Sequence, residues 1–176
     1  IFACRITKTP YIMHDCDAMP GLVTRKLSKR AKYVTLAFEK AKKYIPNKHT
    51  VITGNPIRAG FRTRTKAEAK ANMGLENRLT LCIMGGSQGA KSINNTTIEL
   101  LKEFSQERNL QVIFQTGRKN FAEVTGRLQQ IYPAFEQDKN LIVKPYFDDM
   151  ISVLKSSDIV VSRAGSLSLS EICASE

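Results

Sequence analysis

A glycine-rich run, GGSQGA at residues 85–90, stands between an apolar stretch at 79–84 and a helical pattern that begins near residue 90. Glycine lets a backbone turn tightly and bring its N–H groups close to an anion. The start of a helix adds a favourable field, about 0.3–1 kcal/mol for an exposed anion. With the Ser87 hydroxyl as a further donor, Gly85, Gly86 and Gly89 indicate a cradle for a phosphate or diphosphate. A turn needed only for close packing is the alternative.

The same run nearly matches the phosphate loop of NTPases, which requires a glycine directly before Lys-Ser or Lys-Thr. Ala90 occupies that position, before Lys91 and Ser92, and it places a Cβ where that loop needs bare backbone. We also find no clean apolar strand that ends in an aspartate for magnesium. An NTPase-like switch is therefore the weaker interpretation of this loop.

A second candidate is the run SRAGSLSLSE at residues 162–171, which also follows an apolar stretch and opens a helical pattern. Ser166, Leu167 and Ser168 would offer N–H groups at the start of that helix. Glu171 falls about one turn further on, where a carboxylate can accept hydrogen bonds from both hydroxyls of a ribose. The alternative is an ordinary helix start, with an early glutamate that complements the helix dipole.

Two shorter runs, GNPIR at 54–58 and YFDDM at 146–150, complete the set of candidates. Arg58 can reach a phosphate across a cleft, or it can be a solvated side chain in a turn. Asp148 is a plausible helix N-cap. Phe147 can flank a flat base or belong to the core.

The elements that must position these residues alternate along the chain. Apolar runs predict strands at 10–13, 33–38, 49–53, 79–84, 110–115, 141–144 and 159–162. Amphipathic patterns predict helices at 22–32, 66–73, 90–107, 120–131, 148–155 and 167–174. Such alternation predicts an α/β fold with parallel sheets, in which ligands bind at the carboxyl ends of the strands. A break at residues 54–56 predicts two domains, 1–56 and 66–176, joined by a linker at 57–65.

Composition and charge limit the classes of protein to which this sequence can belong. The net charge is +11, and basic residues concentrate at Arg25, Lys26, Lys29, Arg30, Lys32, Lys40, Lys42, Lys43 and Lys48. This stretch suits an anionic surface or substrate or a nucleic acid, or it is a solvated face. No run reaches the roughly 18 apolar residues of a membrane helix. The four cysteines form no CxxC pair, which indicates reduced thiols and neither a zinc site nor a redox motif.

Taken in order, GNPIR, GGSQGAKSIN, Gln115-Thr116-Gly117, YFDDM and SRAGSLSLSE resemble one family over essentially the whole chain. It is the family of bacterial UDP-N-acetylglucosamine transferases that act on undecaprenyl-diphosphate-linked N-acetylmuramoyl pentapeptide. The resemblance implies a GT-B fold of two Rossmann-like domains with parallel sheets, both incomplete here. Residues 1–56 would end the acceptor domain, and residues 66–176 would begin the donor domain.

The resemblance also implies a set of contacts to UDP-N-acetylglucosamine. Ser87 with its glycine turn, and Ser166, Leu167 and Ser168, would contact the diphosphate region, and Arg58 would reach the phosphates. The backbone of Phe147 would meet uracil, and Glu171 would bind the ribose. Asp17 stands where the family has an asparagine that touches the sugar. Because a carboxylate cannot donate a hydrogen bond as an amide does, the resemblance leaves open which sugar the site selects.

The implied reaction is transfer of the sugar with inversion in peptidoglycan synthesis, and thus in cell-wall biogenesis, cell shape and division. It needs no metal or cofactor. The catalytic base, a histidine in the family, is expected before residue 1, so the isolated chain is expected to be an inactive fragment. Its partners would be UDP-N-acetylglucosamine, the lipid acceptor and the anionic cytoplasmic face of the membrane, with no nucleic acid. Alternatives are a GT-B transferase for another UDP-sugar or glycolipid, and a non-catalytic nucleotide-binding module.

Overall fold

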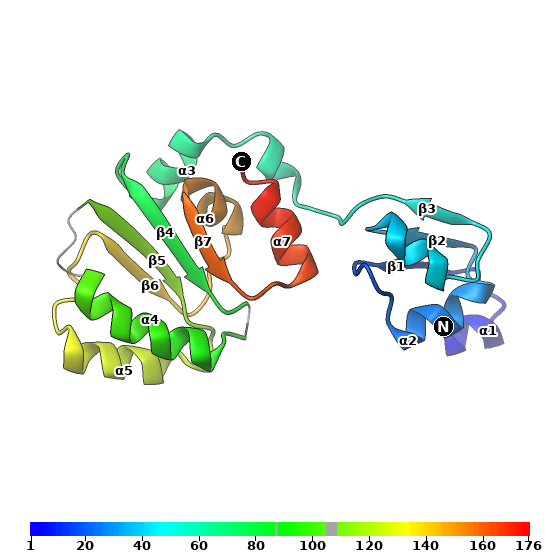
Figure 1. The fold of residues 1–176 in the computed structure, drawn as a ribbon, viewed down its shortest axis with the longest axis horizontal. Helices are drawn as coiled ribbons and strands as arrows, with labels where there is room; N and C mark the ends of the chain where they lie inside the picture. Colours follow the sequence, from blue (N-terminus) through cyan, green and yellow to red (C-terminus); the bar gives the residue numbers. More distant parts are fainter. Residues whose placement is uncertain (87, 105–108) are drawn as a thin grey trace. The chain divides into compact units, whose positions relative to one another are not determined.

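The structure, a computed structural model, describes residues 1–86, 88–104 and 109–176. The chain divides into two compact units, Ile1–Pro56 (unit 1) and Ile57–Glu176 (unit 2), which Figure 1 draws as ribbons. Each unit has a parallel sheet with helices, so the expected α/β class is confirmed. Within the described part of the chain, no helix is both long enough and apolar enough to cross a membrane.

Unit 1 is built on a three-stranded parallel sheet in the order β1-β2-β3. The strands are β1 (Ile12–Asp15), β2 (Tyr33–Leu36) and β3 (Thr50–Ile52). Around them lie α1 (Phe2–Ile6), α2 (Leu22–Leu27) and the 3-10 helices η1 (Ser28–Arg30) and η2 (Glu39–Tyr44). The core is small and consists of Ala31, Val34, Leu36, Ala41 and Ile45, with Tyr11 and Met13 packed against it.

The helix predicted at 22–32 is shorter in the structure, because α2 ends at Leu27 and a 3-10 turn follows. A residue far along the chain accounts for this end. Asn47 Nδ2 donates to the carbonyl oxygens of Ser28, at 2.7 Å, and Ala31, at 2.8 Å. Carbonyl groups left over at a helix end need such partners, and here a side chain from outside the helix supplies them.

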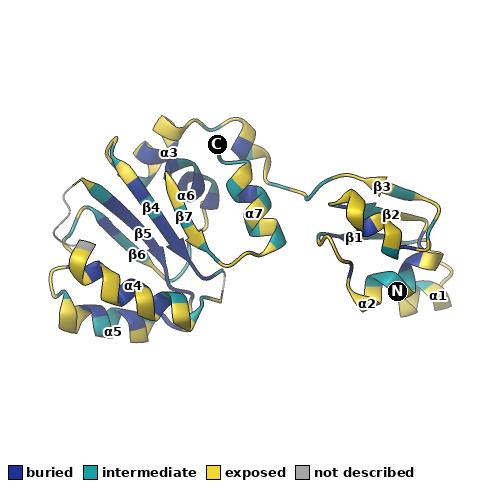
Figure 2. Ribbon diagram, in the orientation of Figure 1, coloured by how far each residue is buried: buried dark blue, intermediate teal, exposed yellow. Residues whose placement is uncertain are grey.

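Unit 2 contains a four-stranded parallel sheet in the order β6-β5-β4-β7. The strands are β4 (Leu79–Met84), β5 (Leu110–Gln115), β6 (Leu141–Lys144) and β7 (Ile159–Ser162), as predicted. The helices are η3 (Ala59–Arg62), α3 (Lys66–Met73), α4 (Lys91–Phe104), α5 (Phe121–Ile131), α6 (Met150–Ser156) and α7 (Ser166–Cys173). The central strands β4 and β5 are the most buried, as Figure 2 shows.

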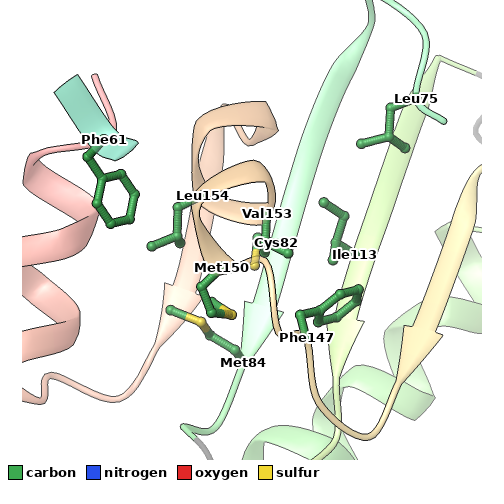
Figure 3. Packing of buried hydrophobic residues seen from close by; sticks show 9 residues of the cluster. All are labelled: Phe61, Leu75, Cys82, Met84, Ile113, Phe147, Met150, Val153 and Leu154. Atoms are coloured by element: carbon green, nitrogen blue, oxygen red, sulfur yellow. The ribbon is translucent and has the colours of Figure 1, made fainter. Parts of the chain in front are cut away.

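The two faces of this sheet bury different side chains, because neighbouring residues of a strand point to opposite faces. Ile83 joins a cluster formed with α4 and α5, whereas Cys82 and Met84 join one formed with α6. The second cluster is drawn in Figure 3, and it includes Phe61 of η3, which is 2% exposed. Burial raises the pKa of the Cys82 thiol to about 12. Through Phe61, the segment 57–65, predicted as a linker, contributes to the core of unit 2.

The N-cap of α6 is Asp149 and not Asp148 as predicted. The carboxylate of Asp149 accepts a hydrogen bond from the Ser152 N–H at 3.1 Å. It also accepts from Arg64 Nη1 at 2.7 and 2.6 Å. Burial alone would raise the pKa of Asp149, but the hydrogen bonds from Ser152 and Arg64 outweigh it and leave the pKa below its ordinary value. Arg64 lies far from Asp149 in the sequence, so the sequence around the start of α6 did not show which of the two aspartates caps the helix.

Candidate functional site

The predicted site residues of unit 2 gather at one edge of its sheet. Gly85, Gly86 and Gly89 follow β4, Phe147 follows β6, and the loop after β7 leads into α7. Because all the strands are parallel, the loops at their carboxyl ends emerge together. Ser87, predicted to contact a diphosphate, lies outside the described residues.

The loop after β4 packs against the loop after β5 so closely that side chains are excluded. Gly89 and Gly117 both have positive φ, 75° and 83°. A Cβ on Gly89 would meet the carbonyl oxygen of Thr116, and one on Gly117 would meet the backbone of Gln88 and Gly89. These glycines are therefore required for packing of the two loops, whatever else the loop binds.

Buried amides hold these two loops in place. Asn94 of α4 is 2% exposed and donates from Nδ2 to the Thr116 carbonyl at 2.9 Å. Asn120 donates to the carbonyls of Gln88 and Thr116, both at 3.2 Å. Sequence reasoning assigned no role to either residue. The sequence contained one indication of a role for Asn94. It is a polar residue on the apolar face of a helix, one turn before the buried Ile98.

A hollow of about 340 Å³ opens between the glycine-rich loop and the start of α7. It is lined by Gly85, Gly86, Arg163, Ala164, Gly165 and Ser168. Gly165, in extended conformation, is the N-cap of α7. The first N–H groups of a helix have no acceptor within the helix, and Ser168, in the first turn of α7, lines the hollow. Two adjacent sources of N–H groups and one arginine make this hollow suitable for an anion.

Glu171 lies one turn beyond Ser168 on the same face of α7. Its carboxylate forms an ion pair with Arg58, with 3.4 Å between Oε1 and Nε. The Glu171 side chain is 12% exposed and that of Arg58 is 45% exposed. The structure thus brings together the residue predicted to bind ribose and the residue predicted to reach the phosphates.

Phe147 has its ring in the core and its backbone in the loop after β6. The residue is 5% exposed and packs with Met150 and Val153, so the ring does not flank a ligand. Lys144 Nζ lies 5.6 Å from the ring centroid. The Phe147 N–H donates to Gln115 Oε1 at 3.1 Å, so the backbone carbonyl of Phe147 is the group that remains for contact with a base.

Asp17 belongs to unit 1, whereas the other candidates belong to unit 2. It is exposed in the loop after β1, and its N–H donates to Asp15 Oδ1 at 3.1 Å. Close by, His14 Nδ1 and Thr35 Oγ1 are 2.9 Å apart. No group of three or more His, Cys, Asp or Glu side chains suited to a metal ion occurs within residues 1–86, 88–104 and 109–176.

Comparison with known proteins gives concordant matches. Residues 80–176 match the family described as the glycosyltransferase family 28 C-terminal domain. A protein of Desulforamulus reducens is 36% identical over 165 residues, which is 93% of this chain and 44% of that protein. One of Pediococcus pentosaceus is 36% identical over 173 residues, 98% of this chain and 46% of that protein. Both are named UDP-N-acetylglucosamine–N-acetylmuramyl-(pentapeptide) pyrophosphoryl-undecaprenol N-acetylglucosamine transferase. The chain thus spans about half the length of the curated relatives it matches.

Solved structures agree on the fold. The crystal structure of Acinetobacter baumannii MurG matches with a TM-score of 0.59 and 27% identity, and it covers 97% of this chain and 45% of that one. The UDP-GlcNAc 2-epimerase of Neisseria meningitidis, bound to UDP-GlcNAc, matches with a TM-score of 0.64. Its identity is 14%, with 94% of this chain and 51% of that chain covered, so it bears on the fold alone. The expected GT-B type of α/β fold is confirmed.

Proposed function

Because this chain belongs to glycosyltransferase family 28, we propose that unit 2 binds the UDP part of a nucleotide sugar at the carboxyl edge of its sheet. The observation that carries the proposal is the hollow between the glycine-rich loop and the start of α7. Glu171, which forms an ion pair with Arg58, lies on the same face of α7 as Ser168, which lines this hollow. Donors for phosphate and an acceptor for hydroxyls therefore stand side by side, as a nucleoside diphosphate requires.

In this proposal each part of UDP has its own contacts. The diphosphate lies against Gly85, Gly86 and Gly89 and against the N–H groups of Ser166, Leu167 and Ser168, with Ser87 as a further donor. Arg58 approaches the phosphates with its remaining N–H donors. Only Nε faces Glu171, and a guanidinium has five N–H donors in all. Glu171 accepts from the ribose hydroxyls, and the Phe147 backbone meets uracil.

We further propose that the complete protein carrying this chain transfers N-acetylglucosamine to undecaprenyl-diphosphate-linked N-acetylmuramoyl pentapeptide, with inversion. Relatives with this name support the proposal. As the acceptor hydroxyl attacks the anomeric carbon, negative charge grows on the departing UDP. N–H groups fixed in advance around the diphosphate stabilise that charge more than the charge of the ground state, and this difference accelerates transfer.

UDP binding by the 176-residue chain is the first test. Isothermal titration calorimetry with UDP, ADP and Mg-ATP should give binding of UDP alone. Binding of Mg-ATP without UDP would instead support the NTPase-like module. Failure of the folded chain to bind any nucleotide would reject the donor site.

A second candidate, transfer of another sugar, is favoured by one residue. Asp17 carries a carboxylate where the family has an amide, and a carboxylate can only accept hydrogen bonds. In the complete protein, competition between UDP-N-acetylglucosamine and UDP-glucose for transfer distinguishes the two. The N-acetyl sugar should be preferred, and a preference for glucose would favour the second candidate.

We also propose that unit 1 attaches peripherally to the anionic cytoplasmic face of the membrane. Basic side chains of its residues 25–48 are mostly exposed, and Leu22 and Val23 are 66% and 65% exposed beside them. Lysines and arginines near an anionic surface contribute roughly 1 kcal/mol each. Vesicles with anionic lipid should sediment the protein at low salt, whereas neutral vesicles should not. Equal sedimentation by both would reject the electrostatic attachment.

A further inference from the structure

Gln115 occupies a central place at the edge where the proposed site lies. It is the last residue of β5, and its register partners are Met84, the last residue of β4, and Lys144, the last residue of β6. The glycine-rich loop and the loop that holds Phe147 begin directly after those two neighbours. Gln115 is 3% exposed, so its side chain is almost completely covered by neighbouring atoms.

The side-chain amide of Gln115 joins these two loops. Its Nε2 donates to the carbonyl oxygen of Gly86 at 3.3 Å. Its Oε1 accepts from the N–H of Phe147 at 3.1 Å. Both polar atoms are therefore used, one for each neighbouring loop, because an amide side chain carries a donor on one atom and an acceptor on the other.

The two loops have different roles in the proposed site. The Gly86 loop is assigned to the diphosphate, and the Phe147 backbone is assigned to the base, which is the opposite end of UDP. We propose that Gln115 is a positioning residue that fixes the spacing between the phosphate loop and the base loop. This inference rests on the proposed binding of UDP and goes beyond it, because Gln115 acts through both loops and does not contact the nucleotide.

Two substitutions separate the donor and acceptor functions of this amide. Gln115→Glu keeps the size and can still accept from the Phe147 N–H, but its carboxylate cannot donate to the Gly86 carbonyl and repels it. Gln115→Met keeps the length and removes both hydrogen bonds. In either variant the two loops lose the side chain that joins them, and the Gly86 carbonyl keeps only the hydrogen bond from the Gly89 N–H, at 3.0 Å within its own loop. Gln115→Met also removes the acceptor of the Phe147 N–H, and a buried N–H without a partner favours a shift of the backbone.

Gln111 supplies a matched control on the same strand. It is 1% exposed and lies at the other end of β5, four residues earlier and so on the same face. Its Oε1 finds no hydrogen-bond partner within the described part of the chain. Gln111→Met therefore tests the effect of losing a buried amide from β5 at a distance from the loops.

The experiment measures the binding of UDP, uridine and inorganic pyrophosphate to the 176-residue chain and its variants, by calorimetry and NMR titration. UDP spans both loops, whereas uridine and pyrophosphate each contact mainly one. Gln115→Glu and Gln115→Met should weaken UDP binding about tenfold or more. They should weaken uridine and pyrophosphate by less than about threefold, because neither fragment depends on the spacing. Gln111→Met should bind all three as the wild type does.

The possible failures are distinguishable. Circular dichroism first establishes which variants fold, and Gln115→Glu, the closest in shape, carries the test if Gln115→Met does not fold. If the wild type binds UDP and the folded variants bind it within about twofold of wild type, the positioning role is wrong. Equal losses for UDP and for both fragments would also overturn it, since they indicate general damage to the site. A folded wild type that binds no UDP rejects the proposed function, and this inference with it.

Discussion

Arg58 and Glu171 form an ion pair in which the two side chains differ in their access to solvent. The carboxylate is 12% exposed and the guanidinium is 45% exposed. A pair of this kind contributes little to stability, because water screens the exposed partner. The Glu171 carboxylate lies one helix turn beyond Ser168, which lines the hollow, and it is therefore well placed to accept hydrogen bonds from a ligand bound there. The pair is therefore better explained by binding than by folding.

We expect the Glu171 carboxylate to distinguish ribose from deoxyribose. The wild type should bind UDP about tenfold more tightly than 2′-deoxy-UDP, since a hydrogen bond to a charged group contributes about 1.5–3 kcal/mol. In Glu171→Ala the two ligands should bind alike. Calorimetry with both nucleotides measures the ratio.

Two other variants serve as controls for this test. Glu123→Ala removes an exposed glutamate from α5 and should leave the ratio unchanged. Arg58→Ala should weaken both ligands while it preserves the preference for ribose. A Glu171→Ala variant that still prefers UDP over the deoxy ligand would show that another group reads the ribose.

At the scale of the elements, the glycines divide into those that the backbone requires and those that it merely tolerates. Gly117 has a φ of 83°, and a Cβ there would meet the backbone of the neighbouring loop. Gly126 lies inside α5 with open space around the position of a Cβ. We therefore expect substitution by alanine to have opposite effects on stability at the two positions.

Gly117→Ala should destabilise the protein by about 2–4 kcal/mol, because it combines an unfavourable backbone conformation with a collision. Gly126→Ala should stabilise it by about 0.5–1 kcal/mol, because glycine is a poor helix former. Urea unfolding of the two variants and the wild type measures both changes. Similar stability of the two variants would contradict the packing of the two loops.

A network of charged and polar groups ties α3 to the amino ends of β4 and β7. The Asp158 carboxylate accepts from Lys66 Nζ at 2.5 Å and from the Thr80 N–H at 2.8 Å. The buried Lys70 lies 3.7 Å from it. Burial alone would raise the pKa of Asp158, but the hydrogen bond from Lys66, the Thr80 N–H and the nearby charges outweigh it, so the pKa lies below its ordinary value.

This shift makes the contribution of Asp158 depend on pH. A carboxyl group with a lowered pKa in the folded state stabilises the protein above its unfolded pKa, and the stabilisation is lost as pH falls through the folded pKa. Asp158→Asn should therefore cost about 1–3 kcal/mol at neutral pH. The difference from wild type should shrink below about pH 4. Denaturant unfolding across this range measures it, and a difference that stays constant with pH would contradict the ion pairing.

The strands of unit 2 were predictable because each is a short apolar run closed by polar or glycine residues. The ends of helices were not, because contacts from far along the chain decide them. Asn47 caps the carbonyls after α2, and Arg64 engages Asp149 at the start of α6. A local pattern contains neither contact.

The same distinction applies to the candidate site. The glycine-rich loop and the start of α7 were visible as motifs that break an apolar pattern. Gln115, Asn94 and Asn120 received no role, although they bind the loops to one another. Their importance depends on which carbonyl groups the fold brings within reach. A polar residue at a position that periodicity assigns to the core was the only sign of it.

At the scale of the whole molecule, the two units differ in what they contribute. Unit 1 has a small core and carries the exposed basic and apolar side chains proposed to meet a membrane. Unit 2 has two core clusters and contains every proposed contact to UDP. Asp17 is the exception among the site residues, and its proposed contact is to the sugar.

This division predicts that residues 57–176, expressed alone, fold and bind UDP with an affinity within about threefold of the complete chain. A core with its own sheet and helices on both faces is sufficient for an independent domain. Unit 1 alone should bind no UDP. Calorimetry on the two pieces and on the 176-residue chain measures these affinities.

The sugar should reveal the contribution of unit 1. If Asp17 contacts the sugar, the complete chain should distinguish UDP-N-acetylglucosamine from UDP, whereas residues 57–176 should bind the two alike. Asp17→Ala in the complete chain should reproduce that loss, because it removes the one proposed sugar contact from unit 1. If residues 57–176 fold but lose UDP binding as well, the nucleotide requires unit 1, and the assignment of the donor contacts to unit 2 is wrong.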